Sequence, residues 1–459
     1  MQKTMDEYDV VVIGSGTAGQ TAAYHLKENG LKTALVEKSD YPGGTCALSG
    51  CQPKKWFYEI TETVAKSRHL IEKGILVPPA VSWPSILKQK NLFTHFIPDN
   101  TIEGLMQADI DFIEGTAQFV NPHELEVKDQ RLKSKFYILA TGAKPMPLPI
   151  DGNEHIITSN DFLNIKDLPQ RILFIGGGFI SFEFAHFASR LGPQHNEIII
   201  VESGDRPLNP FDSEMVQLLL KASEDEGIQI LTKVQIKSIE KHNGEFIVTT
   251  ASGDKFETDL VVHGAGRTAD IEDLNLEAGG VQFSKKGIGV DNHMRTSNPK
   301  VFAVGDCAAG IQLARVADYE AKVAAHNILA QLNNTEKDTI DYNAVPVLLF
   351  TYPQYGMVGK TEDLLKKEGV EYQKSFGKNL RWPTYKRVGL THAAYKILAD
   401  PDGRILGAHI LSDNASGLIN TLKTAMLNGA TTNVLYRQSI MTPYPTRESD
   451  IIYMLDPLR

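Results

Sequence analysis

The sequence has few cysteines: Cys46, Cys51 and Cys307 are the only three among 459 residues. So small a number excludes a fold held together by several disulfides, and any disulfide here is expected to be catalytic rather than structural. A closed structural zinc site needs four ligands, and no cluster of cysteine and histidine surrounds Cys46 and Cys51. We therefore expect no metal site.

The sequence also lacks an excess of positive charge and long apolar runs. Its formal net charge is -9, from 47 basic and 56 acidic residues, which gives no basic surface for nucleic acid or an anionic membrane. The N-terminus, MQKTMDEYDV, has no apolar signal core, and no apolar stretch approaches the ~20 residues of a membrane span. We expect a cytoplasmic protein that binds neither nucleic acid nor membrane.

A pattern of strand, glycine turn, helix and strand occurs twice. The first copy begins with the apolar run Val10–Ile13, which is typical of a strand buried on both faces of a parallel sheet. The second copy starts near Arg171, with its glycine turn about 162 residues after the first. Between the copies, residues 56–96 have a helical pattern that prolines interrupt at 78, 79 and 84. Further strands are expected over 246–250 and 260–263, and a helix ending near 332.

The first glycine turn fits the pattern G-x-G-x-x-G, with Gly14, Gly16 and Gly19 at the glycine positions. The first glycine allows a tight turn, the second lets the backbone approach a pyrophosphate, and the third lets helix and strand pack closely. Glu37 ends the following strand, where an acid accepts hydrogen bonds from a ribose. A glycine-rich turn without a ligand is the alternative, but strand, helix and acid in register favour a dinucleotide site.

The second glycine turn carries Gly176 and Gly178, but Ser181 stands at the third glycine position. Serine is small enough to keep the packing close. Glu202 closes the next strand, where an acid binds the free 2′-hydroxyl of NAD and repels the 2′-phosphate of NADP. Arg206 is the one arginine in the nearby loop. This copy predicts an NADH site, with NADPH less favoured.

Two dinucleotide folds in one chain predict two dinucleotides, FAD and a nicotinamide, although the pattern also fits a flavin monooxygenase. The cysteines decide between these. Cys46 and Cys51 can close a small loop, and Lys54, Lys55 and a following helix favour a thiolate. The alternative is a pair of buried core thiols, which the glycines, lysines and adjacent nucleotide fold disfavour.

The run GGTCALSGCQPKK, from Gly43 to Lys55, resembles the signature of the pyridine nucleotide-disulfide oxidoreductases, which include dihydrolipoamide dehydrogenase, glutathione reductase and mercuric reductase. The resemblance covers essentially the whole chain. It implies an α/β fold with two Rossmann-like FAD- and NAD(P)-binding domains and a C-terminal α+β dimerisation domain. The implied domains are 1–150 (FAD, first part), 151–270 (NAD(H)), 271–340 (FAD, second part) and 341–459 (dimerisation).

The resemblance also implies roles for individual residues. Cys51 would lie against the flavin as the charge-transfer thiolate, and Cys46 would be the interchange thiol that attacks the substrate. Glu183 would pair with Lys54 or Lys55 near the flavin, with a surface ion pair as the alternative. The other implied cofactor residues are Gly44, Thr45, Thr141, Gly142, Gly305 and Asp306 for FAD, and Phe179 (an aromatic gate) and Gly266 for NAD.

Asp306 has a structural alternative, and Cys307 is expected to be structural only. Asp306 would bind the ribityl hydroxyls of FAD, whereas an aspartate after a strand can also be a helix N-cap. Cys307, beside it, has no catalytic context and is interpreted as a small core residue.

The C-terminus departs from the family. The dithiol reductases of the family carry a histidine and, five residues later, a glutamate, and the partner subunit supplies this pair. Here Tyr444 and Ser449 occupy the two positions. Tyrosine, with a reference pKa of about 10, is a poor base at neutral pH, so fast exchange with glutathione or lipoamide becomes doubtful. Mercuric reductase is similar in having tyrosine here, but the chain lacks its terminal cysteine pair. Tyr444 could instead be an interface core residue.

The sequence thus predicts a homodimeric, FAD-dependent NADH:disulfide oxidoreductase that passes electrons through Cys46 and Cys51 to a disulfide acceptor, with an active site shared between subunits. One alternative is a metal-ion or quinone reductase like mercuric reductase. Another is a flavoprotein dedicated to a lipoylated or sulfur-carrier protein.

Overall fold

The computed structural model describes residues 5–458, and the chain divides into two compact units. Unit 1 comprises Met1–Trp56, Leu87–Pro147 and Gly266–Asp341; unit 2 comprises Phe57–Ile86, Leu148–Ala265 and Tyr342–Arg459. Helices α3 (Cys51–His69) and α4 (Trp83–Thr94) each run from one unit into the other.

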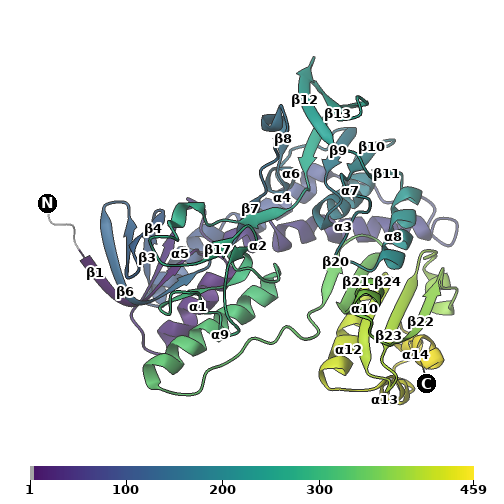
Figure 1. Ribbon diagram of the computed structural model, residues 1–459. Coiled ribbons are helices and arrows are strands. Elements are labelled where there is room, and N and C mark those ends of the chain that lie inside the picture. Colours follow the sequence, from purple (N-terminus) through teal and green to yellow (C-terminus); the bar gives the residue numbers. More distant parts are fainter. Residues whose placement is uncertain (1–4, 459) are drawn as a thin grey trace. The chain divides into compact units, whose positions relative to one another are not determined.

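Unit 1 is built on a seven-stranded sheet (Figure 1). Four neighbouring strands and the added strand β19 are parallel, and the sheet continues as an antiparallel meander. Its order is β3 (Asp111–Glu114), β2 (Thr33–Glu37), β1 (Met5–Ile13), β6 (Gln130–Leu139), β5 (Glu124–Val127) and β4 (Ala117–Asn121), with β19 (Val301–Ala303) beside β6.

Helices α1 (Thr17–Glu28) and α9 (Ala314–Asn333) pack against each other on one face of this sheet (Figure 1). Val10 and Val12 face these helices, whereas Val11 and Ile13 belong to the core of the opposite face. Strand β1 is therefore buried on both sides, as its apolar run predicts. The smaller elements of unit 1 are α2 (Gly44–Leu48), α5 (Ile97–Gln107), β7 (Ala143–Pro145), β16 (Arg267–Ala269), η2 (Glu272–Leu274), β17 (Phe283–Ser284), β18 (Gly287–Ile288) and η3 (Gly305–Cys307).

Unit 2 contains a second parallel sheet, in which the glycine turn again lies between a strand and a helix. Its order is β11 (Ile228–Leu231), β10 (Glu197–Val201), β9 (Arg171–Ile175), β15 (Leu260–His263) and β8 (Ile156–Ile157). Helices α6 (Ser159–Phe162), α7 (Phe179–Leu191) and α8 (Ser213–Asp225), η1 (Asn153–His155) and an antiparallel sheet of β12 (Ile236–His242), β13 (Glu245–Thr250) and β14 (Lys255–Thr258) complete this part.

The C-terminal part of unit 2 is a five-stranded antiparallel sheet with helices (Figure 1). Its order is β20 (Val347–Leu349), β21 (Gln354–Gly359), β24 (Ile405–Ser412), β23 (Ala394–Ala399) and β22 (Gln373–Lys378). Its helices are α10 (Glu362–Glu368), α11 (Pro383–Arg387), α12 (Ala415–Leu427), α13 (Thr432–Ser439), η4 (Glu448–Asp450), α14 (Ile451–Leu455) and η5 (Asp456–Leu458).

The predicted fold class is confirmed: two parallel α/β sheets, each with a glycine turn, precede an α+β part. Strands β13 and β15 and helix α9 lie where the sequence pattern predicts them. The helical region expected over residues 56–96 differs from the structure at two places. Helix α3 already begins at Cys51, and the chain is not helical between His69 and Trp83. Pro84 does not interrupt α4, since the first helical turn tolerates proline. Within residues 5–458, no helix has both the length and the apolar character of a membrane span.

Candidate active site

The first glycine turn connects β1 to α1, and a close backbone approach requires a glycine at its first and third glycine positions. Gly14 has a φ of +106°, and a Cβ on it would lie 2.4 Å from the carbonyl oxygen of Ala140. A Cβ on Gly19 would lie 1.9 Å from the oxygen of Gly14, and one on Gly44 would lie 2.4 Å from Cα of Gly16. The turn is therefore a cradle lined by bare backbone at the N-terminus of α1, whose first turn carries no acid. Such a cradle fits an anionic pyrophosphate.

Glu37 ties the end of β2 to this turn. Its Oε2 accepts hydrogen bonds from the backbone N–H (2.8 Å) and the hydroxyl (2.6 Å) of Ser15, and its Oε1 accepts one from the N–H of Ser39 (2.8 Å). The Ser15 hydroxyl oxygen in turn accepts a hydrogen bond from the N–H of Gly43 at 2.9 Å. The acid thus connects the glycine turn with the segment that leads into the cysteine pair.

The two cysteines lie at the junction of α2 and α3. Cys46 is in α2 and Cys51 is the first residue of α3, with Gly50 between the helices. A Cβ on Gly50 would lie 2.9 Å from the carbonyl oxygen of Thr45, so the close turn between the cysteines needs a glycine there. The side chains of Cys46 and Cys51 are hydrogen-bonded to each other. The structure therefore brings together the pair that the sequence singles out.

Charges on α9 act on this pair. Two causes raise the pKa of the Cys46 thiol most: its hydrogen bond with Cys51 and, second, its burial. The charges of Cys51 and Asp318 raise this pKa further, whereas the Arg315 guanidinium lowers it. Asp318 accepts a hydrogen bond from the Thr17 hydroxyl and pairs with the Arg315 guanidinium, 3.0 Å away. Asp318, Arg315 and Thr17 were not predicted from the sequence, because nothing in it indicates that α9 packs against the start of α1.

The predicted second FAD motif follows β19. Gly305 has a φ of +71°, and its N–H donates to Glu320 Oε2 at 2.6 Å. Burial raises the pKa of the Asp306 carboxyl, opposed by the guanidinium of Arg267. The alternative that Asp306 is a helix N-cap is wrong, because Val304 caps η3 and Leu313 caps α9.

Cys307, next to Asp306, has a structural role. Cys307 is fully buried, as expected for a core residue, and its thiol donates to the carbonyl oxygens of Leu139 and Val304 at 3.3 Å. Thr141 and Gly142 lie between β6 and β7, where Gly142 has a φ of +73°.

The second glycine turn, in unit 2, connects β9 to α7. Gly176 has a φ of +97°, and a Cβ on it would lie 2.4 Å from Cα of Ala265. Gly178 is the N-cap residue of α7. Ser181, at the third glycine position, fits because Gly264 opposite has no side chain. The departure from the glycine pattern is thus matched by a glycine at the end of β15.

Glu202 organises the loop after β10. Its Oε2 accepts a hydrogen bond from the N–H of Gly177 at 2.7 Å, and its Oε1 accepts one from the N–H of Gly204 at 2.6 Å. The carboxylate therefore stands directly against the glycine turn, where the sequence predicts a ribose-binding acid.

The basic side chains in this loop and beside it, after β11, are held by other groups. The guanidinium of Arg206 donates to the carbonyl oxygens of Phe211 and Asn209, each at 2.9 Å. Lys233, which is exposed, pairs with Asp205 at 3.2 Å. Arg206 thus fixes the conformation of its loop. The sequence alone did not indicate this role.

Phe179 and Glu183 lie on α7. Phe179 is the first residue of the helix and is 50% exposed, whereas Glu183 is buried and its Oε1 accepts a hydrogen bond from the N–H of Phe350 at 3.0 Å. The alternative of a surface ion pair for Glu183 is therefore wrong. Lys54 and Lys55 belong to unit 1, so their pairing with Glu183 stays a prediction. Gly266, predicted for the nicotinamide site, also lies in unit 1, with a φ of +106°.

Tyr444 is 73% exposed in the single chain. Ser449, which stands in the glutamate position, is buried, and its hydroxyl donates to the carbonyl oxygen of Thr446 at 2.8 Å. Arg447 anchors the same segment through two hydrogen bonds to Asp413, at 2.7 and 2.9 Å. Ser449 therefore lies in η4, bonded back to Thr446, and does not replace the missing acid.

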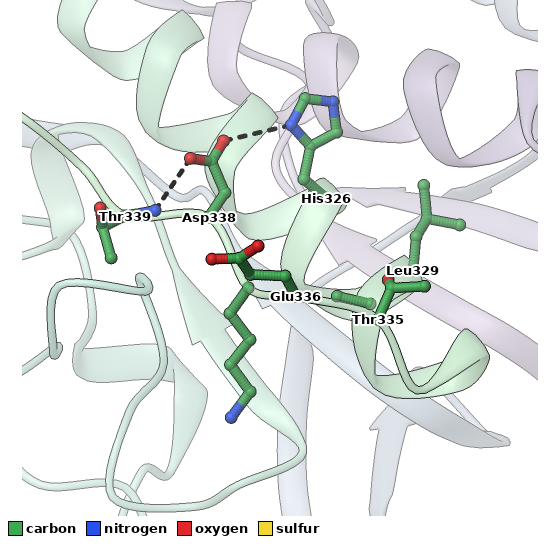
Figure 2. Close-up of a pocket in the computed structure, with 8 residues that line it drawn as sticks. His326, Leu329, Thr335, Glu336, Asp338 and Thr339 are labelled. Atoms are coloured by element: carbon green, nitrogen blue, oxygen red, sulfur yellow. Dashed lines mark hydrogen bonds and ion pairs between the residues drawn. The ribbon is translucent and has the colours of Figure 1, made fainter.

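A pocket of about 610 Å³ lies at the C-terminal end of α9. Figure 2 shows the residues that line it. There the Asp338 carboxylate meets Nδ1 of His326 at 3.3 Å and accepts a hydrogen bond from the N–H of Thr339 at 2.9 Å (Figure 2). None of the site residues that the sequence predicts is among those lining this pocket. In the described part of the chain, no group of three or more His, Cys, Asp or Glu side chains is arranged to hold a metal ion.

Comparisons with known proteins confirm the resemblance. Residues 8–321 match the family model described as pyridine nucleotide-disulphide oxidoreductase, and residues 345–451 match its dimerisation domain. A dihydrolipoyl dehydrogenase of Chlamydia pneumoniae is 32% identical over 94% of this chain and 93% of its own. A mercuric reductase of Staphylococcus aureus is 31% identical over 93% of this chain and 78% of its own. The fold is that of the HOCl-induced flavoprotein disulfide reductase RclA of Escherichia coli, at a TM-score of 0.87 and 24% identity over 98% of this chain and 100% of that chain.

Proposed function

Since the chain belongs to the pyridine nucleotide-disulphide oxidoreductase family, we propose that it takes two electrons from NADH and delivers them through Cys46 and Cys51 to a disulfide acceptor. The family uses FAD and a pyridine nucleotide, and the dimerisation domain supports a homodimer. The observation that carries the proposal is the hydrogen-bonded thiol pair at the junction of α2 and α3, next to the first glycine turn.

Unit 1 supplies the residues that would hold FAD. The cradle of Gly14, Gly16 and Gly44 is bare backbone that fits a pyrophosphate, and Glu37 lies where a ribose acid belongs. The half-buried carboxylate of Asp306 offers acceptors for ribityl hydroxyls. Bound FAD supplies the two-electron chemistry that links a nicotinamide to a thiol pair.

Unit 2 supplies the nicotinamide site, and its loop favours NADH over NADPH. The Glu202 carboxylate stands against the glycine turn, where it binds a 2′-hydroxyl and repels a 2′-phosphate. The Arg206 guanidinium is committed to two backbone carbonyls of its own loop, and Asp205 neutralises Lys233. The loop thus presents no uncommitted arginine to a 2′-phosphate.

The thiol chemistry balances over two exchanges. Two electrons and one proton convert the Cys46–Cys51 disulfide into one thiol and one thiolate. Cys46, once deprotonated, attacks the acceptor disulfide; a mixed disulfide forms and the first acceptor thiolate leaves with a proton. The Cys51 thiolate then attacks the Cys46 sulfur, which restores the disulfide and releases the second acceptor sulfur as a thiolate that takes a proton from solvent. Cys51 begins a 19-residue helix, whose N-terminus favours its thiolate.

Tyr444 of the partner subunit would donate a hydrogen bond to the leaving thiolate. Its high exposure in the single chain is what a residue reaching another subunit requires. Because Ser449 is bonded into its own turn, no acid stands behind the tyrosine at the family's position. We therefore expect slow exchange with free lipoamide at neutral pH.

The acceptor test uses flavin-loaded wild-type protein under anaerobic conditions. One equivalent of NADH is expected to create two new alkylatable thiols, Cys46 and Cys51, and a long-wavelength absorbance band that Cys51→Ser abolishes. Cys307→Ser is the matched control and is expected to keep both signals. If NADH reduces the flavin without exposing new thiols, the redox role of the pair is wrong.

A second candidate acceptor is a metal ion, which the tyrosine at position 444 and the 31% identity to a mercuric reductase favour. Turnover of wild type and Cys46→Ser with lipoamide, mercuric ion and a quinone separates the two. Loss of lipoamide activity alone in Cys46→Ser supports the disulfide acceptor. Negligible turnover with free lipoamide, together with reduction of a lipoylated carrier protein, would instead identify a carrier-dedicated flavoprotein.

A further inference from the structure

One stretch of the dimerisation domain is basic although the chain as a whole is acidic. Between Glu371 and Asp400 the sequence contains no acidic residue, whereas the formal net charge of the chain is -9. Lys374 and Lys396, in this stretch, are paired with carboxylates of the fold, Glu362 among them. The remaining lysines and arginines of the stretch define the basic segment, residues 378–387, and they are Lys378, Arg381, Lys386 and Arg387.

The four cations of the basic segment are exposed and uncommitted. Lys378 ends β22, Arg381 precedes α11, and Lys386 and Arg387 end α11. Within residues 5–458, none of the four forms an ion pair with a carboxylate. A single surface cation is usually only solvated, but four of them in one short segment without an acid raise the local positive potential. The basic segment is therefore a place where an acidic partner is attracted to a chain whose net charge repels it.

The side chains between these cations are held by the C-terminal segment that carries Tyr444. The Thr384 hydroxyl donates a hydrogen bond to the carboxylate of Asp450. The Tyr385 ring centre lies 4.1 Å from the guanidinium of Arg447. The basic segment is thus packed directly against the segment whose tyrosine is expected to meet the leaving thiolate.

An aromatic pair adjoins the cations. Trp382 is partly buried, and its ring centre lies 5.4 Å from that of Tyr453 in α14. Tyr453 is 46% exposed, and α14 packs against β22 (Figure 1). Tyrosine, tryptophan and arginine are the side chains that protein–protein interfaces concentrate at their centres. Their presence here, with no acid in the segment, favours a protein as the occupant.

We propose that the basic segment docks an acidic protein that carries the disulfide reduced by the Cys46–Cys51 pair. This inference rests on the proposed function of the pair. The four cations are spread over a strand end, a loop and a short helix, so together they suit an extended acidic surface better than one small anion. A partner docked there is held beside Tyr444, and the negative charge of the rest of the chain disfavours docking elsewhere.

The test uses synthetic peptides that share one disulfide hairpin and differ only in their flanking residues, which are all glutamate, all glutamine or all lysine. Binding of each labelled peptide to oxidised, flavin-loaded protein is measured by fluorescence anisotropy at low ionic strength. The wild type is expected to bind the glutamate peptide at least about tenfold more tightly than the glutamine peptide, and the lysine peptide most weakly. High salt should remove these differences.

Arg381→Gln/Lys386→Gln removes two of the four cations and is expected to abolish most of the preference for the glutamate peptide. Arg387 stays in place, because its guanidinium opposes the rise in the pKa of Asp450 that burial causes. Lys285→Gln/Lys286→Gln is the matched control. It removes two exposed lysines between β17 and β18 and is expected to keep the preference within about twofold of wild type.

Equal binding of the glutamate and glutamine peptides by the wild type overturns the inference, as does an equal loss of preference in the control. Dissociation of the dimer in Arg381→Gln/Lys386→Gln, measured by light scattering, overturns it too, because the segment would then belong to the subunit interface. Competition by glutathione disulfide as effective as that by the glutamate peptide would identify a small anion as the occupant instead. Because binding involves no electron transfer, these outcomes are distinct from a failure of the proposed function, which NADH-dependent thiol formation in the wild type reports.

Discussion

Ser181 occupies the space that a side chain at Gly264 would need, since a Cβ on Gly264 would lie 1.8 Å from the Ser181 hydroxyl oxygen. The serine stands at the third glycine position of the second turn, and its hydroxyl is buried without a hydrogen-bond partner among residues 5–458. The close packing of helix and strand has therefore been kept by exchanging the positions of glycine and side chain.

Gly264→Ala is expected to lower stability by about 1–3 kcal/mol, because the new methyl group overpacks a rigid strand end. Adding Ser181→Gly should restore most of that loss. Thermal unfolding and NADH affinity of the two single variants and the double variant measure the coupling. Simple additivity of the two effects would contradict a direct contact between these positions.

Glu202 and Arg206 make a matched pair for testing nicotinamide specificity. Glu202→Ala removes the acid that faces the ribose and is expected to lower kcat/KM for NADH by about tenfold, the equivalent of one charge-assisted hydrogen bond. Its kcat/KM for NADPH should rise, because the repulsion of the 2′-phosphate is lost.

Arg206→Ala is the control for this change. Its guanidinium donates to backbone carbonyls, so the ratio of the two kcat/KM values should stay within about twofold of wild type even where the loop loosens. A marked fall in NADPH use by Arg206→Ala would show instead that the arginine reaches the 2′-phosphate.

Tyr444 offers a test of proton supply at the interface. Tyr444→His introduces a group that titrates near neutrality, and we expect at least about a tenfold gain in turnover with lipoamide at pH 7. Tyr444→Phe should instead lower turnover a few fold, because a single hydrogen bond is lost. Equal activities of all three proteins would indicate that residue 444 is only packed at the interface.

Lys396 is a buried cation that three carboxylates surround in unit 2. Its Nζ lies 2.8 Å from Asp212, 2.9 Å from Glu214 and 2.7 Å from Glu362. Burial alone would raise the pKa of Asp212 and of Glu362, but hydrogen bonds from Lys396 and other donors lower both. These acids therefore contribute stability at neutral pH that is lost as the pH falls below their ordinary range toward their lowered values.

Lys396→Met is expected to lower the free energy of unfolding by about 3–5 kcal/mol at neutral pH, because it leaves buried carboxylates without their partner. The variant should recover part of this loss on mild acidification, whereas the wild type should lose stability only once the pH falls below the ordinary pKa range of these acids. Lys374→Met, which removes a more exposed partner of Glu362, is the control and should show a much smaller loss. Unfolding by denaturant at several pH values distinguishes the two behaviours.

Much of the site was predictable because the features that define it are local. The positive φ of Gly14 and Gly176, and the turn between Cys46 and Cys51, depend on residues that are neighbours in the chain. The positions of Glu37 and Glu202 are predictable because each acid lies at or directly after the end of the second strand of its strand–turn–helix–strand pattern. A family signature of this kind can be recognised without knowledge of packing.

Other properties depend on contacts between distant segments. Asp318 meets Thr17 across about 300 residues of chain, and nothing near either residue indicates the contact. Ser181 is tolerated only because Gly264 is opposite. The sequence by itself determined the two dinucleotide turns, the redox pair and the family, since each rests on backbone requirements within a short segment. The tertiary structure decided which charges act on Cys46, that Arg206 is committed to its own loop, and that Ser449 bonds back to Thr446, because burial and hydrogen bonds fix where those side chains point.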